Sequence, residues 1–553
     1  MNQIERKAFA IVLHSHLPWV LSHGVWPHGA EWLFEAASET YIPLIQVVRK
    51  LASEGLPANI TVGLTPILVE QLADDEFKSS FVDYLRSKIE SAQGDVEHFE
   101  REGFHQRAKV ARMWVDFFTD KLEFFDSIGR DLVGEFRRLQ DEGLIEIITS
   151  AATHGYLPLL GRDECVKAQV EIGVAAYEQR FGRRPKGIWP PELAYRPRYR
   201  WKPPVGSIPE FERAGVEEFY HDAGIRYFIV DQHLLKGGKP IGTYLSLFEG
   251  LKLLWEQFKS EYEFKGRELS PYQPYLAASH GSTKMVAFFT RDPQTALQVW
   301  SRDWGYPGDP NYLEFHKRHF PSGHKYWRVT DSKADLADKA EYDPESVNGP
   351  LNAQSDHFVQ LVNRLAAEHD GIVVAPYDTE LFGHWWFEGP RWLYLVLKKL
   401  HKSQVKPVKL GDYLDAFPPE DVIALPEGSW GEGGFHWVWL NEWTSWTWEK
   451  IYDAEVRTIN ILKSKGIDRS LLQQILRELL LLESSDWQFL ITTWSARDYA
   501  EIRFSEHYEA IDRLLKIVEN DKLTPEDLTF IEDLAKKDRI FGRLIEPKFW
   551  NLD

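Results

Sequence analysis

The sequence has little cysteine, no long apolar run and no excess of positive charge. Its single cysteine among 553 residues, Cys165, excludes an internal disulfide framework, and we interpret it as structural. The first apolar run, Ala8–Leu13, is too short for a signal-peptide core, and no run approaches the length of a membrane span. The formal net charge of -19 argues against nucleic acid or an anionic membrane surface as a partner. We therefore expect a soluble, cytoplasmic protein.

Internal repeats and low-complexity linkers are also missing, whereas aromatic residues are plentiful. The composition, 43% hydrophobic and 27% charged, is that of a folded globular protein. At this length the chain has room for about three or four domain-sized units, or for one large barrel with additions. The unusual feature is the presence of 22 Trp, 22 Tyr and 32 Phe, with the Trp residues concentrated in the segments that carry motifs.

Short apolar runs recur along the chain with helix-length intervals between them. Strands that alternate with helices predict a parallel sheet with right-handed crossovers, and seven strands predict an incomplete barrel. A doubly wound open sheet is the alternative, but it usually carries a Gly-rich phosphate loop where this chain has His14-Ser15-His16-Leu17-Pro18. The expected strands are Ala8–Leu13, Ile60–Leu64, Ile145–Ile148, Gly187–Trp189, Tyr227–Val230, Met285–Phe289 and Ile372–Ala375.

Polar or ionisable residues follow all seven of these strands. In a parallel barrel the carboxyl ends of the strands share one rim, which is where active sites lie. One such residue alone is often a helix cap or a satisfied polar group, but so many at corresponding positions predict a functional site. They are His14 and His16, Thr65, His154, Glu192, Asp231 and His233, Arg291 and Asp292, and Asp378 and Glu380.

The remaining segments predict additions to this barrel. Residues 196–209 are rich in Pro, Trp and Arg, and residues 237–282 show little periodicity, as in functional lids or small subdomains. From Glu427 a Gly-rich stretch holds six Trp, at 430, 437, 439, 443, 446 and 448, and helical periodicity follows it. We expect a catalytic barrel in 1–195 and 283–418, an inserted loop or subdomain in 196–282, and a C-terminal α-helical domain with a Trp-rich loop in 419–553.

The stretch Gly371–Gly389 combines a buried strand with two carboxylates and a group of indoles. Asp378 and Glu380 follow the strand, and His384, Trp385 and Trp386 come next. Carboxylates beside aromatic rings are typical of a sugar site, where rings stack on apolar sugar faces and carboxylates act on the bond between sugars. The alternative is a strand-to-helix loop with an N-capping Asp and a buried aromatic cluster.

Three classes of function fit these residues. A retaining glycosidase or transglycosylase needs two carboxyl groups about 5 Å apart, for which Glu192 and either Asp378 or Glu380 are candidates. A non-catalytic carbohydrate-binding protein would need the tryptophans but not the opposed carboxylates. A metal hydrolase, which explains the tryptophans poorly, would use zinc ligands. Its candidate ligands are His14, His16, His154, Asp231, His233 and Asp378.

Five ordered motifs resemble glycoside hydrolase family 57, and within it the α-1,4-glucan branching enzymes. They are HSHLPW from His14, THGYLPLL from Thr153, GIWPPELAYRP from Gly187, APYDTELFGHWWFEG from Ala375 and LLLESSDWQF from Leu480. The resemblance extends over nearly the whole chain, through GLTPILVEQLAD from Gly63, LQVWSRDWGYPG from Leu297, LPEGSWGEGG from Leu425 and VWLNE from Val438.

The resemblance implies an incomplete (β/α)7 barrel with an inserted subdomain and a C-terminal helical domain. It also implies a retaining mechanism without metal or other cofactor, in which Glu192 matches the nucleophile and Asp378, rather than Glu380, matches the acid/base. The family's site-lining positions fall on His14, His16, His154, Arg291 and Asp486, and its glucan-groove aromatics on Trp26, Trp300, Trp430 and Trp439. The insertion at 237–282 looks longer than in relatives, so the covering tyrosine of such enzymes corresponds to Tyr244 or Tyr272.

The expected activity is therefore cleavage of an α-1,4 linkage in an α-glucan, followed by transfer of the segment to a glucose 6-hydroxyl. An α-amylase or a 4-α-glucanotransferase would use the same residues and is the alternative within the family. The motifs do not fix an oligomeric state.

Overall fold

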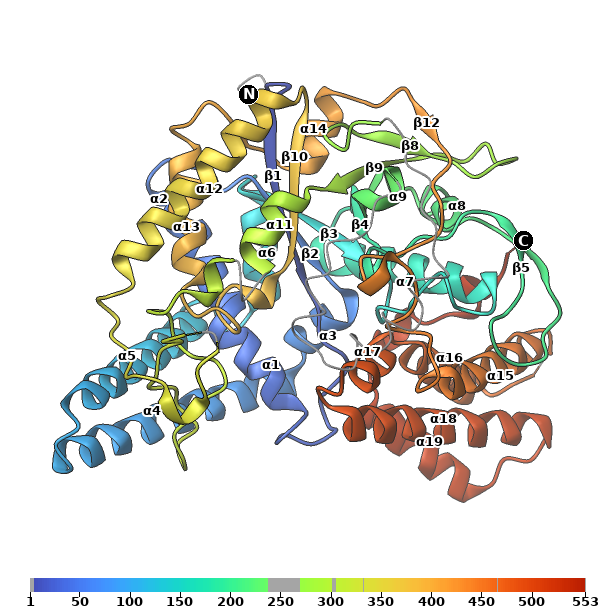
Figure 1. Ribbon diagram of the computed structural model, residues 1–553. Helices are drawn as coiled ribbons and strands as arrows, with labels where there is room; N and C mark the ends of the chain where they lie inside the picture. Colours follow the sequence, from blue (N-terminus) through green and yellow to red (C-terminus); the bar gives the residue numbers. More distant parts are fainter. Residues whose placement is uncertain (1–3, 237–268, 301–304, 332, 465, 553) are drawn as a thin grey trace.

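The computed structural model of the protein describes residues 4–236, 269–300, 305–331, 333–464 and 466–552 (Figure 1). Its centre is a sheet of seven parallel strands in the order β10-β1-β2-β3-β4-β7-β9. These strands contain or overlap the seven apolar runs of the sequence, which confirms the predicted α/β barrel. Their bounds are β1 Ala8–Ser15, β2 Ile60–Leu64, β3 Ile145–Ser150, β4 Gly187–Trp189, β7 Tyr227–Asp231, β9 Val286–Arg291 and β10 Ile372–Asp378.

The ring of strands is incomplete between β9 and β10. The short strand β8, Tyr275–Ala277, pairs antiparallel with the first half of β9, and β12, Val422–Ile423, continues the sheet beyond it. Only the end of β9 therefore approaches β10, where the backbone N–H of Asp292 donates to the carbonyl of Val374 at 2.9 Å. A third short strand, β11, Lys406–Pro407, pairs with the start of β1.

The strands are buried on both faces because helices cover the outside of the barrel and side chains fill its inside. Every residue of β1, β2, β3, β4, β7 and β9 is buried, which explains their β-branched and aromatic composition. The parallel register, in which His14 pairs with Asp378 and Ser15 with Leu64, brings the carboxyl ends of the strands to one rim.

The barrel helices form an outer layer (Figure 1). The pair α4 and α5 extends away from the barrel as a long antiparallel arm, turning at Gly103, whose φ of 78° suits glycine. The amphipathic stretch 108–140 is divided between α5 and α6, because Gly129 and Arg130 adopt left-handed conformations. The bounds are α1 Ala30–Ala36, a π-helix Ala37–Tyr41, α2 Ile42–Ser53, α3 Pro66–Ala73, α4 Asp75–Arg101, α5 His105–Ser127, α6 Leu132–Asp141, α7 Asp163–Phe181, α11 Pro293–Trp300, α12 Asn348–Glu368, α13 Gly389–Leu400 and α14 Leu410–Ala416.

The carboxyl-terminal helices form the predicted helical domain, which packs below the barrel in the view of Figure 1. Helix α18 contacts α15, α16 and α17. The last helix begins at a capping box in which the side chains of Thr524 and Asp527 each accept the other's backbone N–H. The bounds are α15 Ser445–Leu462, α16 Arg469–Leu482, α17 Asp486–Thr493, α18 Arg497–Glu519 and α19 Pro525–Lys537.

The range 196–282 contains both barrel and added elements. A hairpin of β5, Tyr199–Trp201, and β6, Phe211–Arg213, precedes α8, Val216–Asp222, and the barrel strand β7. Helix α9, Gln232–Lys236, follows β7. Residues 237–268, and with them Tyr244, lie outside the described residues.

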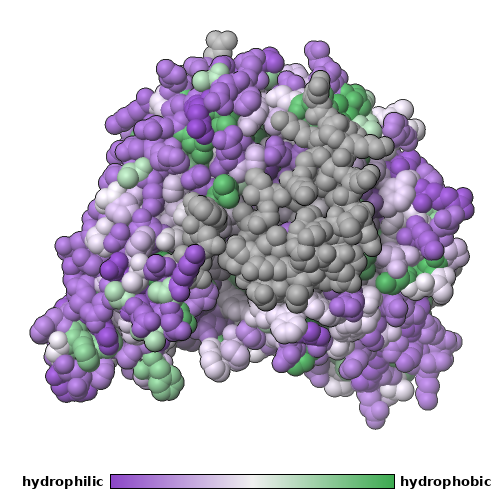
Figure 2. Space-filling model, viewed as in Figure 1, coloured by the Kyte–Doolittle hydropathy of each residue, from purple (hydrophilic) through white to green (hydrophobic). Residues whose placement is uncertain are grey.

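The face of the molecule in Figure 2 is mainly hydrophilic, with small scattered hydrophobic areas. In the described part of the chain, no helix is both long enough and apolar enough to cross a lipid bilayer.

Candidate active site

Two carboxyl groups, those of Glu192 and Asp378, lie at opposite sides of the barrel rim. Glu192 follows β4 and Asp378 ends β10, and in the strand order these two strands are separated by β1, β2 and β3 on one side and by β7 and β9 on the other. Repulsion from the Glu192 carboxylate contributes to raising the pKa of Asp378. The charges of the two groups therefore interact across the rim.

Glu192 is held in an unusual backbone conformation by the Trp-rich loop. Its φ of 61° and ψ of 24° are left-handed, a region that residues other than glycine occupy at a cost and that is common at functional sites. The backbone N–H of Trp430 donates to the Glu192 carbonyl at 3.1 Å, and the Trp430 indole Nε1–H donates to Glu192 Oε2 at 2.8 Å. Burial raises the pKa of Glu192 to about 7, although the Trp430 hydrogen bond opposes this shift.

Asp378 is the more strongly perturbed of the two carboxyls. Burial raises its pKa well above the ordinary value, and Glu380 and Glu192 raise it further, while Arg291 lowers it. Glu380 is itself buried and accepts hydrogen bonds from the Tyr41 hydroxyl and from the backbone N–H of His16. The raised pKa of Asp378 suits a general acid, and Glu192 is the candidate nucleophile opposite it.

Three histidines line the rim between the two carboxyls. The His14 ring stacks on Trp189 with centroids 4.4 Å apart, and its Nε2 lies 3.1 Å from Nε2 of His154. His154 Nδ1 lies 3.0 Å from the Ser485 hydroxyl and 3.9 Å from Glu192 Oε1. Burial lowers the pKa of both His14 and His154, so neutral imidazoles face the site and can hydrogen-bond to uncharged hydroxyls.

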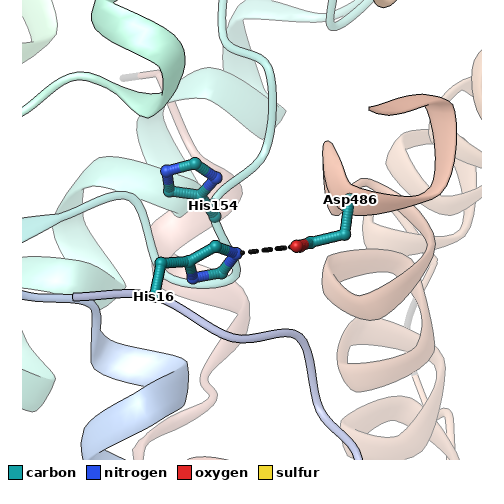
Figure 3. Close-up of side chains that lie close together, drawn as sticks. All are labelled: His16, His154 and Asp486. Carbon is teal, nitrogen blue, oxygen red and sulfur yellow. Dashed lines mark hydrogen bonds and ion pairs between the residues drawn. The ribbon is translucent and has the colours of Figure 1, made fainter. Parts of the chain in front are cut away.

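The C-terminal domain reaches the same rim through Asp486, the first residue of α17. Figure 3 shows His16 pointing at Asp486, with the ring of His154 lying over that of His16. His16 Nε2 lies 2.9 Å from Asp486 Oδ2, its Nδ1 lies 3.1 Å from the Thr65 hydroxyl, and its ring is 3.9 Å from that of His154. The barrel and the helical domain thus share one polar cluster.

The same cluster has the geometry of a potential metal site. The ligand atoms of His16, His154 and Asp486 all lie within 4.8 Å of one another. They are, however, already engaged with protein partners, because His16 bonds Asp486 and Thr65 and His154 faces His14 and Ser485. A metal ion bound here would have to displace the His16–Asp486 hydrogen bond.

Asp231 and His233, the other candidate metal ligands, instead anchor the Trp-rich loop. Asp231 Oδ2 forms an ion pair with Arg291 Nε at 3.5 Å, and His233 Nδ1 lies 3.0 Å from Asp231 Oδ1. Burial raises the pKa of Asp231, but Arg291 and His233 outweigh it and lower the pKa to about 2. His233 Nε2 lies 3.0 Å from the carbonyl oxygen of Gly434, and the Arg291 guanidinium lies 5.6 Å from the Trp430 ring centroid. The charged pair therefore positions both Arg291 and the loop.

The four tryptophans matched to the glucan groove occupy different environments. Trp430 makes edge contacts with Trp189 and with Trp300, at centroid distances of 5.3 and 5.8 Å, beside Glu192. Trp439 is 1% exposed and stacks on Tyr156 at 4.5 Å, so in this structure it packs inside the loop. Trp26 is 78% exposed, so its indole is open to a ligand.

Tyr272, one of the two cover candidates, is enclosed. Its ring stacks on His369 at 4.0 Å, its hydroxyl donates to Asp292 at 3.0 Å, and its carbonyl accepts from the backbone N–H of Ile372. Ile372 is the first residue of β10, whereas Asp378 is the last. A covering role for Tyr272 would therefore require this segment to move.

Several site residues carry no signal in the sequence pattern. Tyr41 ends a π-helix, Ala37–Tyr41, inserted between α1 and α2, and such insertions are frequent at functional sites but are not visible as a period. Ser485 orients His154 through its hydroxyl group, as Thr65, which the sequence did place after a strand, does for His16. Trp189 was expected as a buried strand residue, and only the folded structure reveals that its ring supports His14 and Trp430.

Known proteins share this architecture and sequence. The 1,4-alpha-glucan branching enzyme of Thermococcus kodakarensis is 42% identical over 546 residues, covering 97% of this chain and 77% of that protein. Its crystal structure superposes with a TM-score of 0.89 over 99% of this chain and 97% of the other, at 40% identity. A branching enzyme of Pyrococcus horikoshii gives a TM-score of 0.87 with the same coverages and identity. The alpha-amylase AmyC of Thermotoga maritima gives 0.80 at 27% identity, covering 99% of both chains.

Family models divide the chain in two. One described as 1,4-alpha-glucan branching enzyme, C-terminal, matches residues 449–550. The other, Glycosyl hydrolase family 57, matches residues 10–426, which contain both carboxyl groups and all of the barrel strands except the first two residues of β1. The chain belongs to glycosyl hydrolase family 57.

Proposed function

We propose that this protein is a 1,4-α-glucan branching enzyme that cleaves an α-1,4 linkage by a retaining double displacement and transfers the segment to a glucose 6-hydroxyl. The observation that carries the proposal is the pair of opposed, partly buried carboxyls, Glu192 and Asp378, whose charges interact across the rim. The similarity of the whole chain to branching enzymes, including the separate C-terminal match, supports branching over other family reactions. The proposed substrates are α-glucans, and the proposed location is the cytoplasm.

In the first step Glu192 attacks the anomeric carbon and the C1–O bond breaks. Asp378 gives its proton to the departing oxygen, and the glucan segment stays on Glu192 as an ester. The raised pKa of Asp378 suits this donor role, because it favours the protonated form of the group. Arg291, which lowers the pKa of Asp378 and lies beside Trp430, stabilises negative charge on the rim.

In the second step the acceptor 6-hydroxyl attacks the anomeric carbon and displaces Glu192. Asp378, now ionised, takes the proton of that hydroxyl, the new C1–O bond forms and the C1–Glu192 bond breaks. Two inversions give net retention, so an α-linkage yields an α-linkage. The neutral imidazoles of His14 and His154 and the His16–Asp486 pair are placed to hold sugar hydroxyls during both steps.

An α-amylase is the second candidate, because the Thermotoga amylase has the same fold over the full chain. The two activities differ only in whether water or a sugar hydroxyl takes the segment.

Proton NMR of amylose before and after incubation distinguishes branching from hydrolysis. We expect new α-1,6 anomeric signals with little gain of reducing ends. Reducing ends that rise without α-1,6 signals would replace the proposal by hydrolysis.

A further inference from the structure

Trp494 occupies a position in which packing does not explain a tryptophan. It is the residue directly after α17, where its φ of 59° and ψ of 15° are left-handed. Glycine is the usual residue at such a helix end, because a side chain there is strained. The Trp494 side chain is nevertheless 61% exposed, so burial of its ring offsets little of that strain. A strained, exposed indole is a reason to look for a binding role.

A second tryptophan lies beside it. The Trp443 ring, which is partly exposed, has its centroid 5.7 Å from that of Trp494 with the planes at 57°. Asn441 ties this part of the Trp-rich loop to α17, since its Nδ2 donates to the Thr492 hydroxyl at 2.9 Å and its Oδ1 accepts from the Trp443 backbone at 2.9 Å. The pair is therefore fixed in place by both segments. We call Trp443 and Trp494 the aromatic platform.

Arg497 completes the polar edge of the platform. Its guanidinium lies 5.6 Å from the Trp494 ring centroid, and its Nε donates to Glu501 at 2.8 Å. A sugar ring has apolar C–H faces and hydroxyls at its edge, so indoles beside a guanidinium match both parts.

One face of α17 joins the platform to the active-site rim. Asp486, Phe489 and Leu490 are partly exposed on this helix, and with Trp494 they have the spacing of a single helical face. The helix residues between them, including Trp487 and Ile491, are buried. The rise of an α-helix puts Trp494 roughly 12 Å along the axis from Asp486. Asp486 bonds His16 at the rim, so this path begins at the candidate active site (Figures 1 and 3).

We propose that Trp443 and Trp494 form a glucan-binding platform outside the catalytic rim, which holds an α-1,4-glucan chain that runs along α17 toward Asp486. The chemical class of the ligand rests on the proposed function. The platform binds by stacking on sugar faces, and its benefit is confined to chains long enough to extend from the rim to Trp494.

The test measures glucan binding and stability together. In a Glu192→Gln background, which keeps the glucan intact, we compare Trp494→Gly and Trp443→Ala with the exposed-aromatic control Phe320→Ala, whose side chain is 90% exposed. Affinity electrophoresis in glycogen or amylose gels gives the Kd for long chains, and isothermal calorimetry gives the Kd for maltotriose.

We expect Trp494→Gly and Trp443→Ala to raise the Kd for glycogen by about three- to tenfold, the range expected for one aromatic contact. The Kd for maltotriose and both values for Phe320→Ala stay unchanged. The melting temperature of Trp494→Gly is not lowered, because glycine fits the left-handed position.

An unchanged glycogen Kd in Trp494→Gly would overturn the proposal. A lowered melting temperature with equal loss of affinity for both ligands would instead assign Trp494 a structural role. Failure of branching itself has a different signature. If the wild-type protein forms no α-1,6 linkages but Trp494→Gly still lowers its affinity for glycogen, the platform proposal stands and the proposed branching reaction fails.

Discussion

Trp430 holds Glu192 by two hydrogen bonds, one from its backbone N–H to the Glu192 carbonyl at 3.1 Å and one from its indole N–H to Oε2 at 2.8 Å. The first bond fixes a left-handed backbone, and the second stabilises the charged form of the side chain. A loop more than two hundred residues further along the chain therefore lowers the pKa of the proposed nucleophile against the effect of burial.

Replacing Trp430 by Phe should move the acidic limb of the pH–rate profile upward. A hydrogen bond donated to a carboxylate lowers its pKa, so its loss raises the pKa of Glu192 above about 7. Since the nucleophile must be ionised, kcat/KM at pH 6 falls more than kcat/KM at pH 8. We expect a shift of about one pH unit, the size of one hydrogen bond to a charged group.

The control for this variant is Trp448→Phe. Trp448 is also buried in the Trp-rich region, but its indole N–H donates to the carbonyl of Trp439 at 2.8 Å and not to a titrating group. Its pH profile should match that of the wild type. If the pH profiles of Trp430→Phe and Trp448→Phe shift equally, or if neither shifts, Trp430 does not control the ionisation of Glu192.

Glu192→Gln should abolish turnover and make the protein more stable at high pH. With a folded pKa of about 7 and an ordinary value of 4.5, the native state keeps a proton that the unfolded state loses between these pH values. Stability then falls as pH rises through that window, by about 3 kcal/mol in total. An amide does not ionise, so the melting temperature of the variant should exceed that of the wild type at pH 8 and match it near pH 4.5. A constant difference across this range would contradict the raised pKa.

The barrel could be predicted from the sequence because each of its strands is an apolar run with polar residues after it. Burial on both faces requires such runs in β1, β2 and β3, and the functional rim requires the polar residues. The long arm of α4 and α5 was only partly anticipated. Helix α4, Asp75–Arg101, is largely polar and was not expected; its few buried residues face α5 and, through Phe77 and Phe81, Phe34 of α1.

The residues of the candidate site could be predicted where the chemistry requires a particular residue type. They could not be predicted where side-chain packing determines the role of a residue. Glu192, Asp378 and the histidines stand out as charged or polar groups after strands. The placement of Trp439 inside its loop depends on its contact with Tyr156 and on Gly431, where an added Cβ would lie 2.6 Å from the Trp439 ring. The role of Asp231 as an anchor, rather than a metal ligand, depends on Gly434 reaching His233 from far along the chain.

Asp378→Asn should abolish activity on α-glucans but retain glycosylation by substrates with good leaving groups. The raised pKa of Asp378 keeps a proton available for the departing oxygen, and an asparagine has none to give. An aryl maltooligosaccharide, whose phenolate leaves without protonation, should lose far less of its rate than amylose. Pre-steady-state release of the phenol measures this step. Equal fractional losses for both substrates would remove Asp378 from the acid role.

Exhaustive chelation should leave turnover unchanged. His16 and His154 use their ring nitrogens within the protein, on Asp486, Thr65, His14 and Ser485, and the proposed steps need no Lewis acid. Activity and melting temperature are measured after dialysis against EDTA and again after addition of zinc. Loss of activity on chelation with recovery on zinc, at constant melting temperature, would favour the metal-hydrolase alternative.

The last prediction concerns the choice between water and a sugar acceptor. Both nucleophiles use the same Asp378, so the chemistry at Glu192 cannot discriminate between them, and branching must depend on how well water is kept from the glycosyl-enzyme. The Trp-rich loop is the described segment best placed to do this. It is tied to Tyr195 at Gly428 by two backbone hydrogen bonds of 2.8 and 3.0 Å, and to His233 at Gly434.

His233→Ala removes the tie at Gly434 and leaves the one at Gly428. The loop then closes less tightly over the ester, so more of the segment goes to water. We expect the ratio of reducing ends to α-1,6 linkages to rise about fivefold, the effect of one hydrogen bond. The matched control is His316→Ala, since His316 Nδ1 also lies 3.0 Å from a carboxylate two residues earlier, Glu314, but in a segment outside the loop. Both products are measured on the same samples, with circular dichroism to check folding. If the two rates of a folded His233→Ala variant fall in parallel, the loop does not control the acceptor.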